Sequence, residues 1–128
     1  MSEPPALDFE IQFYEQLCQR LPKDVRVLSL LAQLYTLNRQ YDDGLKLDRK
    51  LVRLCPEDPT VHYNLACSLA LKQRYADALR ALKDAVALGY RSIDWMLQDA
   101  DLQGLHAKPK FRDWLVQLRI ELGLPEVS

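Results

Sequence analysis

The feature that most constrains this chain is a segment over residues 59–88 that reads as two amphipathic helices separated by a polar break at residues 72–74. Apolar residues recur every three or four positions in both halves, which is the spacing of one helix face. Small Ala66 and Ala78 fall where two such helices would cross most closely, and bulky Leu82 would fill the space beside the crossing. The segment therefore predicts a helical hairpin.

The same pattern lies upstream at an offset of 34 residues, the separation between Tyr41 and Tyr75. At this offset Ala66 falls on Ala32, and Gly44 stands at the position of the small residue in the second helix. A helical hairpin that recurs at a fixed period predicts an array in which each unit packs only on its neighbours.

A helix–turn–helix unit with this period resembles the tetratricopeptide repeat. The resemblance implies an all-α fold, namely a short right-handed repeat array in one domain over residues 1–128. Full repeats are expected at 25–58 and 59–92, preceded by a half repeat at 7–22 and followed by a closing segment at 93–124. The positions that match the family pattern in the first full repeat are Leu31, Ala32, Tyr35, Tyr41, Gly44, Leu51 and Pro56.

Composition excludes several classes of function. The chain is 48% apolar, which is enough for a core, and its net charge of −1 gives no broad basic field for nucleic acid or an anionic membrane. No apolar run is long enough to span a membrane, and the N-terminus lacks a hydrophobic signal core. Cys18, Cys55 and Cys67 have no metal-type spacing, so reduced thiols in a cytoplasmic protein are expected.

Local signals predict where the helices begin and end. Asp24 and Asp58 are expected N-caps, and Pro59 suits the first position of a helix. Gly89 is an expected left-handed stop, and Gly123 is expected to end the last helix. Prolines at positions 4 and 5 predict an extended tail over residues 1–6. The predicted helices run over about 8–21, 25–38, 41–54, 59–71, 75–88, 92–98, 101–105 and 109–122.

The two ends of the array need to cover apolar surface. The helix at 8–21 is apolar on more than one side, and no upstream helix is expected to cover Phe9 and Phe13. This pattern suggests a homodimer through the N-terminal helix. At the other end, the residues expected to seal the core are Trp95, Met96, Leu102, Leu105, Phe111, Trp114, Leu115 and Leu118.

Catalytic and metal chemistry have weak signals. Asp99 and Asp101 could form a carboxylate pair or a metal site, but helix capping explains them better. His62 and Cys67 stand five residues apart on one helix and point about 140° away from each other, so they do not form a nucleophile and base. No catalytic, cofactor-binding or metal-binding residue is predicted.

The resemblance instead implies binding in a concave groove, because in this family the first helix of each repeat lines a surface that holds extended peptides or partner helices. A subgroup that clamps a C-terminal carboxylate is not matched, because Ser29, Gln33 and Asp94 replace its Lys and Asn residues. We expect a protein-interaction module without catalysis or a cofactor, and the alternative is a self-assembling structural subunit. The predicted groove residues are Arg26, Ser29, Leu30, Gln33, Leu37, Tyr63, Asn64, Cys67 and Leu71.

Asp48 breaks the repeat pattern, because a large apolar residue is usual at its position, and His62 departs from the pattern on the next helix. A buried carboxylate needs a partner or access to solvent. Two interpretations remain open. Either Asp48 pairs, with His62, Tyr63 or Arg49 as the candidates, or it lies at a solvated edge.

Overall fold

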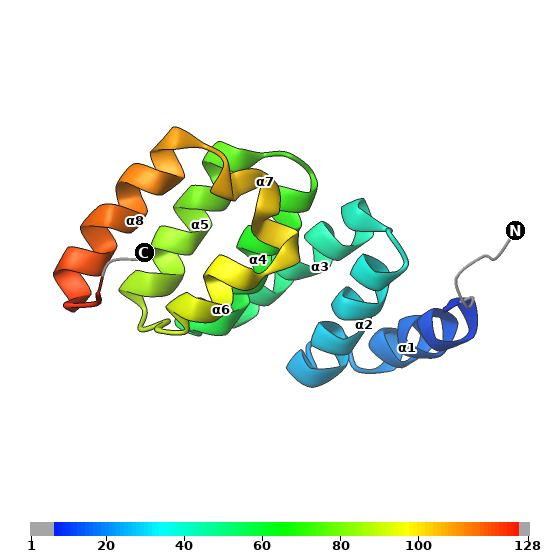
Figure 1. The fold of residues 1–128 in the computed structure, drawn as a ribbon. Coiled ribbons are helices and arrows are strands. Elements are labelled where there is room, and N and C mark those ends of the chain that lie inside the picture. Colours follow the sequence, from blue (N-terminus) through cyan, green and yellow to red (C-terminus); the bar gives the residue numbers. More distant parts are fainter. Residues whose placement is uncertain (1–6, 126–128) are drawn as a thin grey trace, which may run out of the picture.

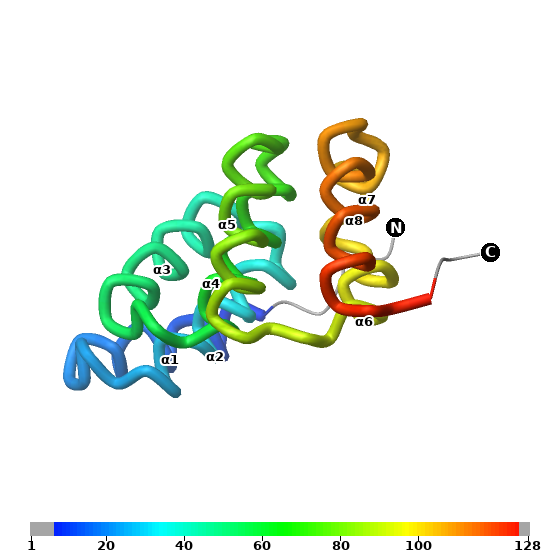
Figure 2. Tube along the Cα trace, turned by 90° about the vertical axis from the view of Figure 1, so that its left-hand side faces the viewer, coloured from blue at the N-terminus to red at the C-terminus, as the bar shows by residue number. Residues whose placement is uncertain are grey.

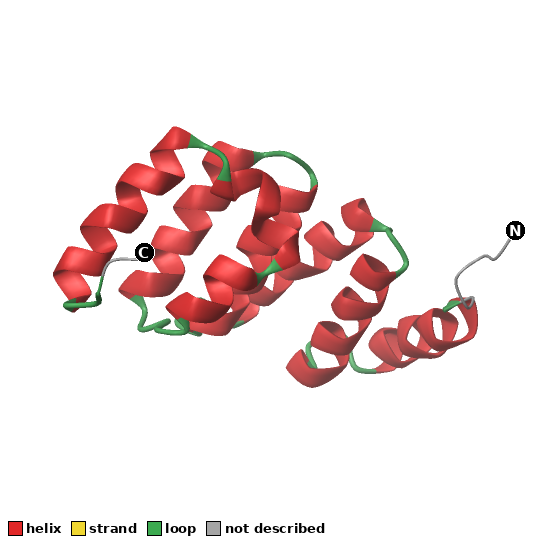
Figure 3. Ribbon diagram, viewed as in Figure 1, coloured by secondary structure: helices red, strands yellow, loops and turns green. Residues whose placement is uncertain are grey.

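The structure, a computed structural model, describes residues 7–125, and every regular element in that range is a helix (Figure 3). The expected tail over residues 1–6 lies outside the described residues. No helix between residues 7 and 125 combines the length and hydropathy needed to cross a membrane. The elements are α1 (Asp8–Arg20), α2 (Val25–Leu37), α3 (Tyr41–Leu54), α4 (Pro59–Leu71), α5 (Tyr75–Ala87), α6 (Ile93–Gln98), the 3-10 helix η1 (Ala100–Leu102), α7 (Gln103–His106) and α8 (Pro109–Leu122).

The helices pack in adjacent pairs, α2 with α3 and α4 with α5, so the predicted all-α helical repeat array is confirmed. Figures 1 and 2 place α1 at one end of the array and α8 at the other. In Figure 2, α6, α7 and α8 lie together beside the α4–α5 pair. This closing segment therefore occupies the position where a further pair would stack.

The repeat extends to the backbone of the turns. Arg39, between α2 and α3, and Gln73, between α4 and α5, both have a φ of 61°. Each turn is closed by the same bond, in which the amide of the next residue donates to a carbonyl five residues earlier, at 2.8 Å and 2.9 Å. These equivalent turns set the same hairpin geometry in both units.

Small residues stand at the helix crossings, as predicted. Ala66 and Ala78 have no exposed surface. A Cβ atom added to Gly44 would come within 3.0 Å of the Thr36 hydroxyl oxygen, so only glycine fits there without movement of its neighbour. The close approach of each helix pair thus depends on residues without bulky side chains.

Caps and stops also agree with the sequence. The Asp24 carboxylate accepts a hydrogen bond from the Val27 amide at 3.1 Å, and Asp58 accepts one from the Thr60 amide at 2.8 Å. Pro59 is the first residue of α4. Gly89 and Gly123 both have positive φ angles, 113° and 66°, and follow the ends of α5 and α8.

The core is unevenly distributed. One large cluster joins α4 and α5 to the closing segment, and it includes the fully buried Leu82, Met96, Leu102 and Phe111. Two small clusters hold the N-terminal half, one around Ile11, Leu31 and Tyr35, and the other around Leu28, Leu51 and Val61. The C-terminal half is therefore the more extensively packed part of the array.

The closing segment seals the core with most of the predicted residues, but the prediction for Trp95 is wrong. α6 turns Ile93 and Met96 into the core, and Trp95 lies about 200° around the helix from Ile93. Its side chain is 57% exposed. An unpredicted feature is Gly104, where an added Cβ would lie 2.3 Å from the Tyr75 hydroxyl oxygen.

At the opposite end, α1 packs on α2 with one side only. Ile11 is buried, and Tyr14 packs against the same cluster. Phe9 is 78% exposed and Phe13 is 54% exposed. No described segment covers these two aromatic side chains.

Candidate functional site

A groove of about 350 Å³ lies between α2, α4 and the start of the closing segment. Its floor is one face of α4, where Asn64, Cys67, Ser68 and Leu71 follow helical spacing. α2 and α3 form one wall, and α6 with η1 form the other. The lining residues are Ser29, Ala32, Gln33, Thr36, Leu37, Asp48, Leu51, Tyr63, Asn64, Cys67, Ser68, Leu71, Trp95, Asp99 and Asp101.

Two of the predicted groove residues do not belong to it. Leu30 lies about 100° around α2 from Ser29, and Arg26 lies in the first turn of the helix, so neither lines the groove. The predicted residues that do line it are Ser29, Gln33, Leu37, Tyr63, Asn64, Cys67 and Leu71.

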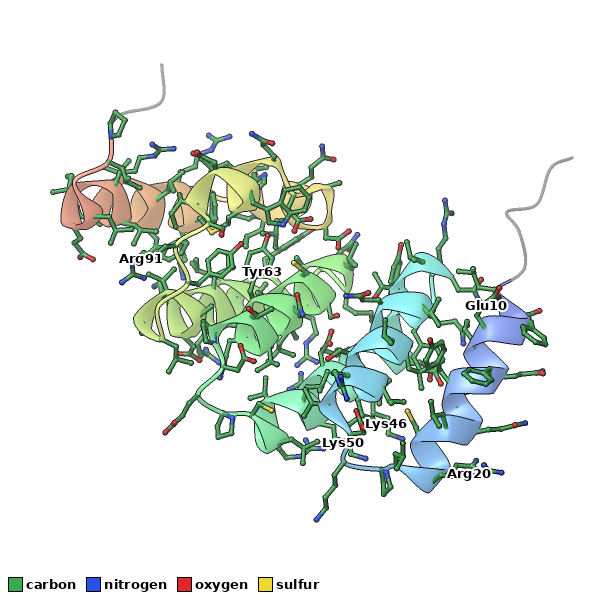
Figure 4. All side chains as sticks on the ribbon, turned by 90° about the horizontal axis from the view of Figure 1, so that it is seen from below. Glu10, Arg20, Lys46, Lys50, Tyr63 and Arg91 are labelled. Carbon is green, nitrogen blue, oxygen red and sulfur yellow. The ribbon has the colours of Figure 1, made fainter. Side chains whose placement is uncertain are left out.

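Tyr63 is buried rather than presented as a free aromatic anchor. Its hydroxyl donates to Asp99 Oδ2 at 2.6 Å, and its ring stacks on Tyr90 with a centroid separation of 4.4 Å. Figure 4 shows Tyr63 between α4 and the closing segment. Burial, followed by the bond to Asp99, raises the pKa of Tyr63 above its ordinary value. The side chain therefore fastens the groove wall to its floor.

Asp99 is the centre of this attachment. Its Oδ2 also accepts from the Cys67 thiol at 3.6 Å, and its Oδ1 accepts from the Asp101 amide at 3.0 Å. The latter bond caps η1, so the predicted capping role is confirmed for Asp99. It is wrong for Asp101, because the next helix begins after Leu102 without a side-chain cap.

Cys67, Asp99 and Asp101 place three potential metal-ligand atoms within 4.8 Å of one another. The geometry fits hydrogen bonding better than metal binding, because both oxygens of Asp99 already accept bonds. Burial, reinforced by the charge of Asp99, raises the pKa of the Cys67 thiol. A raised pKa disfavours the thiolate that a metal would require.

Asp48 enters the groove wall from α3 and is only 5% exposed. The Ser68 hydroxyl donates to its Oδ2, and no described residue hydrogen-bonds its Oδ1. Burial raises the pKa of Asp48 to about 6, and the bond from Ser68 partly opposes the shift. The carboxyl group is therefore buried on one side and open to the groove on the other.

The Ser68 bond corrects both interpretations of Asp48. The proposed pair with His62 is wrong, because His62 Nε2 lies 2.8 Å from the Pro56 carbonyl oxygen and donates to it. Tyr63 bonds to Asp99 instead, and Arg49 makes no ion pair with Asp48. A solvated edge is also wrong, because the side chain is only 5% exposed and Ser68 bonds its Oδ2, so that only Oδ1 opens to the groove. Ser68 follows the groove residue Asn64 by four positions on α4, so helical spacing was the available signal for Ser68.

A second hollow, of about 380 Å³, lies between α5 and the start of α8. Apart from Lys108 and Lys110, apolar and aromatic side chains form its lining, including Leu79, Leu105 and Phe111. Tyr75 also lines this hollow, and Lys108 Nζ lies 4.7 Å from the centre of its ring in a cation–π contact.

Comparison with known proteins gives no assignment. No protein-family model matches the sequence, and no curated protein matches it.

Proposed function

We propose that this chain is a tetratricopeptide-like interaction module that binds an extended peptide or a partner helix in its groove and catalyses no reaction. The observation that carries the proposal is the use of equivalent helix positions. Ser29, Gln33 and Leu37 of α2 line the groove, and so do the residues 34 positions later, Tyr63, Cys67 and Leu71. Successive helices thus offer one continuous surface to an elongated ligand.

The chemistry of the groove supports binding rather than catalysis. No histidine lines it among the described residues. The Tyr63 hydroxyl and the Cys67 thiol are both bonded to Asp99, and their raised pKa values keep them protonated at neutral pH. A phenol or a thiol that acts as a nucleophile or a general base needs a lowered pKa instead.

Two leucines on α2 provide a matched test. Leu37 is 72% exposed and lines the groove, whereas Leu30 is 44% exposed on the same helix and lies outside it. A peptide selected from a displayed library should bind with roughly micromolar affinity, on the order of −8 kcal/mol. Leu37→Ala should weaken that binding about tenfold, and Leu30→Ala should leave it unchanged. Equal effects of the two substitutions would remove the groove as the binding site.

Self-association is the second candidate, because α1 exposes Phe9 and Phe13 one turn apart. A dimer through this stripe predicts that Phe9→Glu with Phe13→Glu converts a dimer to a monomer and keeps the helical content. Ile120→Glu is the control, since Ile120 is an exposed apolar residue at the other end of the array. A wild-type protein that sediments as a monomer at high concentration contradicts this candidate.

The thiols support a cytoplasmic location for the module. Cys18, Cys55 and Cys67 are all free. Free thiols are usual in reducing compartments, where disulfide bonds do not persist.

A further inference from the structure

The charged side chains that line the groove are all acidic. They are Asp48, Asp99 and Asp101, and neither lysine nor arginine lines the groove within the described chain. The chain has 17 basic residues, and they lie elsewhere, with Lys46 and Lys50 away from the groove on α3 (Figure 4). The chain itself thus supplies no cation to the groove.

Asp48 is the groove residue for which the lack of a neighbouring lysine or arginine matters most. Its side chain is only 5% exposed and its Oδ2 accepts from Ser68, while its Oδ1 opens to the groove and has no partner among the described residues. Tyr14 and Leu82 occupy the equivalent repeat positions, so the fold accepts an apolar side chain there. Burying a carboxylate without a counter-charge is unfavourable. A cation that enters the groove would provide the missing partner.

The opposite wall offers a second acceptor. Asp99 is occupied by donors from Tyr63, Cys67 and the backbone of Asp101. The partly buried Asp101 carboxylate receives no side-chain hydrogen bond from the described residues. Burial, together with the charge of Asp99, raises the pKa of Asp101, and no basic group opposes the shift. The groove therefore has acceptors on both of its walls.

Apolar side chains frame these acceptors. Trp95 and Leu37 are exposed at opposite walls, and Leu71 lies on the floor between them. An indole ring binds a cation over its face, and leucines bind aliphatic chain. From Asn64 to Leu71 the floor rises by about 10 Å, roughly the length of three extended residues. Such dimensions and chemistry fit a peptide better than an isolated metal ion.

We infer that the groove selects a peptide segment with a basic side chain, whose charged group lies between Asp48 and Asp101 while neighbouring apolar residues contact Leu37 and Trp95. Arginine fits best, because its planar guanidinium has five donors and can reach both walls at once. This inference rests on the proposed function and adds the class of partner to it.

The test uses three synthetic peptides of equal length, acetylated and amidated, with leucines on both sides of one variable residue. The variable residue is arginine, norleucine or glutamate, and affinity is measured by fluorescence polarisation with the full chain. The arginine peptide should bind at least tenfold more tightly than the norleucine peptide. The glutamate peptide should bind most weakly.

Variants of the protein then test which carboxylates cause the preference for the arginine peptide. Asp48→Asn and Asp101→Asn should each reduce the advantage of arginine to less than threefold and leave the affinity for norleucine unchanged. Asp94→Asn removes an exposed acidic residue of α6 outside the groove, so it should leave the advantage intact. Circular dichroism of each variant confirms that the fold is retained.

The outcomes separate the inference from the proposed function. Norleucine binding as tightly as arginine overturns the inference but leaves a peptide-binding groove. An advantage of arginine that survives both groove substitutions also overturns it, because the charge would then act elsewhere. If none of the peptides binds and library selection yields none, the inference and the proposed function both fail.

Discussion

Replacing Asp48 with asparagine should stabilise the protein at neutral pH. Asparagine has nearly the same shape, and its side-chain oxygen can accept the same bond from Ser68. It cannot ionise, so it removes the cost of a buried negative charge. Its amide nitrogen would face the groove, where Asp48 Oδ1 has no partner in the described structure.

The magnitude follows from the pKa of Asp48, which burial raises from 3.8 to about 6. A shift of about two units corresponds to about 3 kcal/mol. The folded state binds the proton of the Asp48 carboxyl group more tightly than the unfolded state does. The stability that this protonation contributes is therefore fully present below pH 4. It is lost as the pH rises through about 6. The variant should therefore match the wild type near pH 4 and exceed it by about 3 kcal/mol at pH 8.

Urea unfolding followed by circular dichroism between pH 4 and pH 8 measures this difference. All other carboxyl groups are common to both proteins, so their contributions cancel. Asp94→Asn serves as the control for loss of a negative charge on the surface. A stability difference that does not change with pH, or a variant that is less stable at pH 8, would refute the reasoning.

Three further predictions test packing and thiol chemistry. Gly104→Ala should destabilise the fold by about 1–3 kcal/mol, because the added Cβ would lie 2.3 Å from Tyr75 Oη. The loss, measured by urea unfolding, should be smaller in a Tyr75→Ala background. Equal losses in both backgrounds would contradict the clash. Ala78→Leu should destabilise by about 1–3 kcal/mol in urea unfolding, because Ala78 is fully buried at a helix crossing, and an unchanged midpoint contradicts this placement. In native protein at pH 8, iodoacetamide should alkylate Cys67 more slowly than Cys55, because burial raises the pKa of the Cys67 thiol; equal rates by mass spectrometry contradict it.

The elements of this fold could be predicted because their signals are local. Asp24 and Asp58 cap helices through amides two or three residues away, and Gly89 follows the end of α5 with a positive φ of its own. The 34-residue period predicted that a signal in one unit would recur at the equivalent position of the next, as Asp24 does at Asp58. It also placed most groove residues on the correct face of α2 and α4, since a face depends only on helical spacing.

The details of the groove could not be predicted, because they depend on the closing segment, which lacks the repeat period. Tyr63 would face open space in a bare array, but Asp99, 36 residues further along the chain, binds its hydroxyl. Trp95 was expected in the core with the other apolar residues of the closing segment, whereas the register of a six-residue helix exposes it. The repeat pattern marked Asp48 as unusual, but the predicted partners His62, Tyr63 and Arg49 were wrong, because the bond comes from Ser68 of α4.

The uneven core has a consequence for local unfolding. The floor of the groove and one wall belong to the large cluster, whereas α2, which supplies the other wall, rests on the small clusters around Ile11 and Leu28. Segments with few buried apolar contacts open at lower free energy, so α1 and α2 should exchange their amide hydrogens faster than α4 and α5. A ligand that touches both walls binds only when α2 is folded, and it should therefore slow amide exchange most in α2.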